Sequence, residues 1–177
     1  MSRVRYLTVG ITAAMLLGLG ATPAGADTKV VRDKVGETNA ANDITRVRFS
    51  NGEHRISAVF HYRNLGEGHF GAEVVVDVGH KGARAYALSR VEVANGKWRV
   101  RLFRFSQKRH SPYQRVRCHG KSVEAFPGPK SKLLYRLPQR CLGDDAGDAW
   151  FQVRNYRSEG AVEGDHAPRR PVFVAQD

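Results

Sequence analysis

Apolar and polar residues alternate with a period of two through most of the chain, and this alternation constrains the fold more than any other feature. In Phe70–Val78, for example, Val74 and Val76 fall on one side, and Glu73 and Asp77 fall on the other. Successive side chains of a β-strand point to opposite faces, so the pattern is typical of strands buried on one face. The expected strands are Ile44–Phe49, His54–Arg63, Phe70–Val78, Arg84–Ala94, Lys97–Phe105, Leu133–Leu137, Trp150–Arg157 and a final edge strand, Val172–Val174.

Turn signals separate these segments. Asn51-Gly52 and Asn95-Gly96 are dipeptides that favour tight β-hairpins. No segment has a convincing helical stripe. About eight short strands joined by turns predict an all-β fold, an antiparallel β-sandwich of jelly-roll or immunoglobulin-like type. A small β-barrel is the alternative.

One strand departs from the pattern. In Lys97–Phe105, Arg104 falls among the apolar positions, whereas Phe103 and Phe105 fall among the basic ones. A β-bulge near Leu102 would restore the alternation, and we expect one there. The following segment, residues 106–132, is less regular and rich in proline.

The amino-terminal residues 1–26 have the three parts of a secretory signal peptide. Arg3 and Arg5 form a basic start, Leu7–Gly20 is apolar, and the small residues Ala24 and Ala26 stand at the positions that signal peptidase reads. The apolar run is too short to span a bilayer, and no later segment is long and apolar enough to do so. We therefore expect cleavage before residue 27 and secretion to the cell exterior.

The chain has two cysteines, Cys118 and Cys141. In an oxidising compartment a single pair of this kind is expected to form a disulfide within the secreted domain, residues 27–177. The alternative is a free thiol nucleophile at Cys118, beside His119. The disulfide is favoured because an exported thiol with an available partner tends to oxidise.

Positive charge is concentrated in one part of the chain. The formal net charge is +12, and Val93–Gly143 holds 13 basic residues and a single acid, Glu124. Such a segment can attract phosphate-rich or carboxylate-rich polymers, and interleaved aromatic rings can stack on their units. The alternative is an arginine-rich, solvated sheet face. The candidate contacts are Arg99, Arg101, Arg104, Lys108, Arg109, Tyr113, Arg115 and Arg117.

The export signal argues against nucleic acid as the partner and favours an extracellular glycan or an anionic polymer of the cell envelope. We therefore expect a non-catalytic binding module. The alternatives are a small secreted hydrolase and an extracellular protein-binding inhibitor that presents Pro127-Gly128-Pro129 as a rigid edge. The sequence leaves the oligomeric state open.

Catalytic and metal motifs are absent from the sequence: there is no GxSxG elbow, phosphate loop or HExxH pattern. Glu73 and Asp77 share a strand face and could form a glycosidase pair, but acids placed in this way are more often outward charges on a half-exposed strand. Asp144, Asp145 and Asp148 lack the spacing of a calcium loop, so a structural calcium ion is unsupported. We expect no metal and no cofactor.

The late part of the chain resembles a group of small, largely uncharacterised secreted proteins of actinomycete-type bacteria. The similarity rests on Pro138-Gln139-Arg140-Cys141-Leu142-Gly143, a Pro-x-Arg-Cys-Leu-Gly pattern, and on the tryptophan-containing strand that begins at Trp150. In this chain residues 144–149 are inserted between the two. The resemblance implies a β-sandwich similar to carbohydrate-binding and related extracellular modules, and it carries no active site to transfer.

Overall fold

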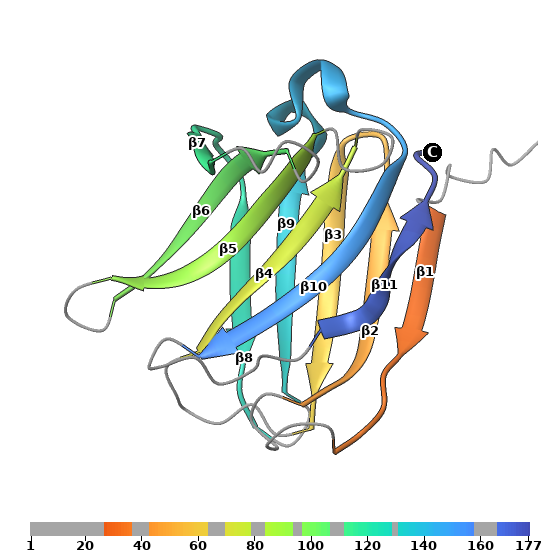
Figure 1. Cartoon of the computed structure of the whole chain (residues 1–177), viewed down its shortest axis with the longest axis vertical. Helices are drawn as coiled ribbons and strands as arrows, with labels where there is room; N and C mark the ends of the chain where they lie inside the picture. Colours follow the sequence, from red (N-terminus) through yellow and green to blue (C-terminus); the bar gives the residue numbers. More distant parts are fainter. Residues whose placement is uncertain are drawn as a thin grey trace, which may run out of the picture.

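The protein is a sandwich of two antiparallel β-sheets packed face to face (Figure 1). The computed structural model describes residues 27–36, 43–63, 70–78, 84–93, 97–106, 112–128, 131–157 and 166–177. The all-β sandwich expected from the alternation is thereby confirmed, and the two sheets do not close into a barrel. The expected signal peptide lies outside the described residues.

The first sheet has five strands in the spatial order β1 (Asp27–Arg32), β2 (Ile44–Asn51), β3 (Arg55–Tyr62), β9 (Lys132–Pro138) and β8 (Ser122–Phe126). The second sheet has six strands in the order β11 (His166–Val174), β10 (Ala149–Arg157), β4 (Phe70–Asp77), β5 (Ala85–Val93), β6 (Lys97–Phe105) and β7 (Gln114–Val116). Two short 3₁₀ turns, Gln139–Cys141 and Gly143–Asp145, connect β9 to β10 across one end of the sandwich.

The core consists of the alternating apolar residues that face each other between the sheets. Phe49 of β2 meets Phe151 of β10 with ring centroids 5.2 Å apart, and Phe60 stacks on Tyr135 at 4.8 Å within the first sheet. All four side chains are essentially inaccessible to solvent. Burying each contributes roughly 1.5–3 kcal/mol, so the alternation itself supplies the driving force for the two-layer fold.

A tight turn joins β2 and β3, but it lies two residues later than expected: Asn51 still pairs with Ile56 in the ladder, and Glu53 and His54 occupy the turn. The amides of Gly52 and Arg55 each donate to the carbonyl of the other residue, and β2 and β3 pair antiparallel on either side. The second expected hairpin turn, Asn95-Gly96, lies outside the described residues, but β5 and β6 pair up to the Val93–Lys97 position that flanks it.

Sequence analysis missed three strands and shortened a fourth. β1 occupies a lead-in that was not assigned as a strand, β7 and β8 lie in the irregular segment, and β11 is nine residues long instead of three. β1, β7, β8 and β11 are all edge strands, which pair on one side only and need less apolar surface. Pro168 and Pro171 in β11 also weaken its sequence signal, although proline is tolerated at a sheet edge.

The β-bulge expected near Leu102 is wrong. β6 pairs with β5 without any shift in register from Ala85–Phe105 to Val93–Lys97. Leu102 faces the core, and Phe103 and Phe105 stay on the outer face with the arginines, where they pack against Ala85 and Ala87. A second, smaller apolar cluster on the outer face therefore removes the need for a bulge.

Cys118 and Cys141 form the expected disulfide, with Cα atoms 5.6 Å apart. The bond ties the segment after β7, in the second sheet, to the 3₁₀ turn after β9, in the first sheet. Within the described ranges, no helix has the length and apolar character needed to cross a membrane.

Candidate functional site

The arginines of β6 share one face of the second sheet. Arg99 and Arg101 alternate with the core-facing Val100 and Leu102, so they point to the outer surface of the six-stranded sheet together with Phe103. Arg99 is exposed and Arg101 is half-buried. The unbroken register thus brings charge and aromatic rings together on one strand face.

The short edge strand β7 extends this surface. Arg115 lies directly opposite Phe103 in the β6–β7 ladder and is exposed. Tyr113, just before β7, stacks on Phe105 at 4.5 Å with an interplanar angle of 14° and meets Phe103 edge-on at 5.8 Å. We call Arg99, Arg101, Phe103, Phe105, Tyr113 and Arg115 the arginine–aromatic surface.

Not every expected contact belongs to this surface. Arg104 has the opposite parity and pairs across the strand with core-facing Tyr86, and its guanidinium donates to Gln114 Oε1 at 3.2 Å. Arg117 is exposed one residue beyond the end of β7, next to the disulfide, where the ladder that places Arg115 has ended. Lys108 and Arg109 lie outside the described residues. Of the eight expected contacts, the structure groups Arg99, Arg101, Tyr113 and Arg115.

Other basic residues of the segment lie on the five-stranded sheet. Arg136 of β9 forms an ion pair with Glu124 of β8, and the ammonium of Lys132 lies 4.8 Å from the centre of the Phe126 ring. Both pairs belong to the five-stranded sheet. The basic stretch of sequence is therefore divided between two sheets and does not form a single patch.

The two acids considered as a glycosidase pair are separated along β4. Glu73 and Asp77 are four residues apart, which places their Cα atoms about 13 Å from each other. Glu73 is nearly buried and accepts a 3.1 Å hydrogen bond from the Ser89 hydroxyl, which directs its carboxylate toward β5. Paired glycosidase carboxyl groups lie roughly 5–10 Å apart, so this arrangement gives no support to such a pair.

The histidines that the structure describes form no metal-binding group. The ring nitrogen Nε2 of His61 accepts a 3.1 Å hydrogen bond from the Arg46 guanidinium, and the pKa of His61 is lowered by burial and by the charges of Arg46 and Lys132. His54 is exposed beside Glu53. Over the described parts of the chain, no three His, Cys, Asp or Glu side chains are arranged to hold a metal ion.

A pocket of about 440 Å³ lies at the opposite side of the same outer face. Its walls are formed by residues of β4, β10 and β11 and by the loop between β9 and β10: Asp77, Val78, Asp144, Asp145, Ala146, Gly147, Asp148, Trp150 and Phe173. Trp150 and Phe173 are 43% and 41% exposed, with ring centroids 5.3 Å apart. We call it the Trp150 pocket.

Sequence analysis did not identify this pocket. A signal was present, because Trp150 alternates with the core residues Ala149 and Phe151 and must therefore face outward. The partner ring, Phe173, could not be foreseen because the pairing of β10 with β11 was unknown.

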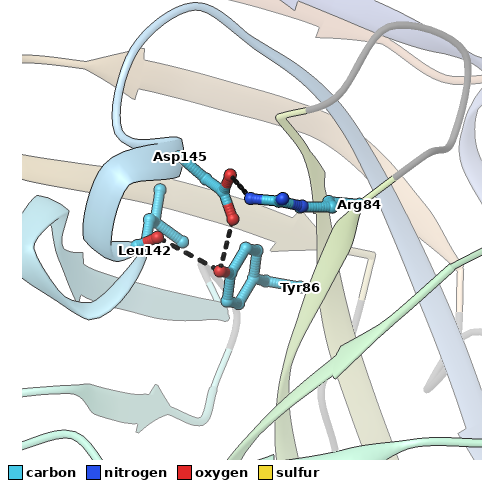
Figure 2. Close-up of polar contacts among 4 residues, drawn as sticks. All are labelled: Arg84, Tyr86, Leu142 and Asp145. Carbon is cyan, nitrogen blue, oxygen red and sulfur yellow. Dashed lines mark hydrogen bonds and ion pairs between the residues drawn. The ribbon is translucent and has the colours of Figure 1, made fainter.

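The loop that forms the acidic wall is anchored to β5 (Figure 2). The Tyr86 hydroxyl lies 2.9 Å from Asp145 Oδ2 and 3.1 Å from the Leu142 carbonyl oxygen, and Arg84 forms an ion pair with Asp145. Burial, together with the hydrogen bond and negative charge of Asp145, raises the pKa of Tyr86 to about 12. The 3₁₀ turn Gly143–Asp145 is thus held against the sheet.

A buried amide network anchors the other end of the same loop. The Asn51 side chain, inaccessible to solvent, donates to the carbonyls of Gly147 at 3.0 Å and Val174 at 3.1 Å. Its oxygen accepts a 2.7 Å hydrogen bond from Gln139. On the outer side, the Gln176 amide donates to Asp148 at 2.8 Å. The walls of the pocket are therefore held in place from both ends.

Comparison with protein-family models, with curated proteins and with solved structures finds no match for this chain. The resemblance of its Pro-x-Arg-Cys-Leu-Gly stretch to the actinomycete group stays an expectation. The two features of the outer face that bear on the function of the protein are the arginine–aromatic surface and the Trp150 pocket.

Proposed function

We propose that this protein is a secreted, non-catalytic module that binds an anionic extracellular glycan or envelope polymer on the outer face of its six-stranded sheet. The observation that carries the proposal is the grouping of Arg99, Arg101 and Arg115 with three aromatic rings on one sheet face, formed by β6, β7 and the residue before β7. The Cys118–Cys141 disulfide is compatible with an extracellular location.

The chemistry of this surface fits a polyanion with ring-shaped units. A guanidinium presents several hydrogen-bond donors in a planar fork that matches carboxylate, sulfate and phosphate groups. Tyr113 is 48% exposed, and it is held by its stacking on Phe105, so its ring is available to contact a ligand without first being ordered. The positive net charge adds long-range attraction for polyanions.

Contacts of this kind make binding sensitive to salt. By analogy with nucleic acids, each neutralised anionic group contributes about 0.7–0.9 to the slope of log affinity against log salt concentration. Three arginine contacts therefore predict that affinity falls about 20- to 40-fold between 50 and 200 mM salt.

The experiment is retention of the secreted domain on immobilised polyanions, namely heparin, polygalacturonate and poly(glycerol phosphate), at these two salt concentrations. The test variant is Arg99→Gln with Arg115→Gln. The matched control is Arg48→Gln with Arg55→Gln, which removes the same charge from exposed arginines of the other sheet. The proposal predicts retention at low salt that the test variant loses and the control keeps. Equal retention of both double variants, or no retention of the parent, would reject it.

A further inference from the structure

The Trp150 pocket lies on the same sheet face as the arginine–aromatic surface, but its residues suit a different kind of ligand. Across the ladder, Phe173 pairs with Trp150, Trp150 with Asp77, Asp77 with Ala85, and Ala85 with Phe105. One row of outward residues therefore runs from the pocket to the arginine–aromatic surface. Trp150 and Phe105 are separated by three strand spacings, about 14 Å.

The rings of Trp150 and Phe173 form an apolar wall of the pocket and do not belong to the hydrophobic core. Trp150 and Phe173 stand opposite each other on β10 and β11 with their side chains on the solvent side. Ligand sites typically combine such exposed rings with a few fixed polar groups in a cavity of roughly 300–1,000 Å³, and the pocket falls within that range. A flat ligand ring can stack on Trp150 as bases stack on aromatic side chains.

The polar groups of the pocket select which ring can enter. Its described walls hold four aspartates and no basic side chain. An ionised carboxylate accepts hydrogen bonds and cannot donate them, so the ligand must supply the donors. Asp148 accepts one hydrogen bond from the Gln176 amide at a single oxygen, and Asp144 is exposed to solvent. A carboxylated, sulfated or phosphorylated unit would be repelled here.

We infer that the Trp150 pocket binds a sugar unit that carries no acidic group, stacked on Trp150 with its hydroxyl groups donating to the aspartates. A sugar ring has both required surfaces, an apolar face of C–H groups and an edge of hydroxyl donors. An amino sugar satisfies the same requirements, because an ammonium group also donates. The inference rests on the proposed function in one respect: both surfaces would contact the same glycan, with its acidic units on the arginines and a non-acidic unit in the pocket.

The test is an array of neutral, amino and acidic oligosaccharides, followed by calorimetric titration of those retained. The variants are Trp150→Ala, Trp150→Phe and a control, Phe126→Ala, which removes an equally exposed ring from the five-stranded sheet. Circular dichroism and thermal melting establish that each variant folds. If Trp150→Ala does not fold, Trp150→Phe alone decides, by the loss of ligand-induced quenching of tryptophan emission.

The expected result is retention of at least one neutral or amino oligosaccharide, with affinity at least tenfold lower in Trp150→Ala and at most about threefold lower in Trp150→Phe. Phe126→Ala, and the Arg99→Gln and Arg115→Gln double variant, should leave this binding unchanged. Salt should have little effect on a neutral oligosaccharide, whereas it should weaken binding of an amino oligosaccharide, whose ammonium pairs with the aspartates. The inference is overturned if no neutral or amino oligosaccharide is retained, or if Trp150→Ala binds like the parent. Because the polyanion experiment uses different ligands and different variants, failure of the pocket and failure of the arginine–aromatic surface are separate outcomes.

Discussion

Replacement of Tyr86 by phenylalanine tests how the pocket loop is held. The substitution keeps the buried ring and removes only the hydroxyl, which lies 2.9 Å from Asp145 Oδ2 and 3.1 Å from the Leu142 carbonyl oxygen. A hydroxyl has one proton, so it satisfies these two acceptors jointly rather than with two full hydrogen bonds. Leu142 itself is 2% exposed, which leaves its carbonyl little access to water.

The expected cost of Tyr86→Phe follows from these contacts. A hydrogen bond to a charged acceptor contributes about 1.5–3 kcal/mol, and Arg84 remains to pair with Asp145, so we expect a loss of about 2 kcal/mol in the free energy of unfolding. For a domain of this size, that corresponds to a Tm lower by about 4–8 °C. The Arg84 side chain is 61% exposed, so Arg84→Ala should cost about 1 kcal/mol or less.

Urea denaturation of Tyr86→Phe and Arg84→Ala measures which variant loses more free energy of unfolding. In Tyr86→Phe, hydrogen exchange should also become faster for the amides of residues 142–146. A Tyr86→Phe variant as stable as the parent, or less destabilised than Arg84→Ala, would refute the reasoning. The titration of Tyr86 gives an independent check. Its folded-state pKa, about 12, is above the ordinary value of 10.0, so its stabilising contribution is present below pH 10 and is lost as pH rises through 12.

The remaining predictions concern the frame of the sandwich. The lowered pKa of His61 means that its contribution to stability is present above pH 6.5 and is lost as the pH falls toward the folded-state value; Arg46→Gln should raise that pKa in an NMR titration. Replacing Cys118 and Cys141 together by serine should lower the free energy of unfolding by about 3 kcal/mol relative to the oxidised parent, the loop entropy of a 23-residue separation, and denaturation should show the reduced parent to be about as stable as the variant. Asn51→Ala should cost about 3 kcal/mol by the same assay, because three hydrogen bonds are lost, two of them fully buried and the one to Gly147 partly buried.

The two-layer fold was predictable because its central strands alternate regularly. β3 and β9 bury every second residue along most of their length, which is the pattern that a single sheet face imposes. The order of the strands was not predictable, because β9 pairs with β3 across 70 residues of sequence and no local signal encodes that choice. The error at Leu102 had a related cause: parity shows that two faces differ, but it does not show that the outer face also carries an apolar cluster around Phe105.

The candidate site was predictable in part for the same reason. Arg99 and Arg101 could be placed on one face because they lie on one strand, and Arg115 joined them only through the β6–β7 pairing. Counting charge along the chain overestimated the patch, since Arg136 lies on the other sheet and is paired with Glu124. The Trp150 pocket depends on a loop and on three strands that are distant in sequence, so it could be found only in three dimensions.

The most direct test of the central claim is the salt dependence of heparin binding by the secreted domain. Our account predicts that log affinity falls linearly with log salt concentration with a slope of about −2 to −3, and that Arg99→Gln with Arg115→Gln reduces the size of this slope by about 1.4–1.8. The Arg48→Gln and Arg55→Gln control should keep the parent slope. A slope that is the same in both double variants would place the polyanion elsewhere on the molecule and contradict the account.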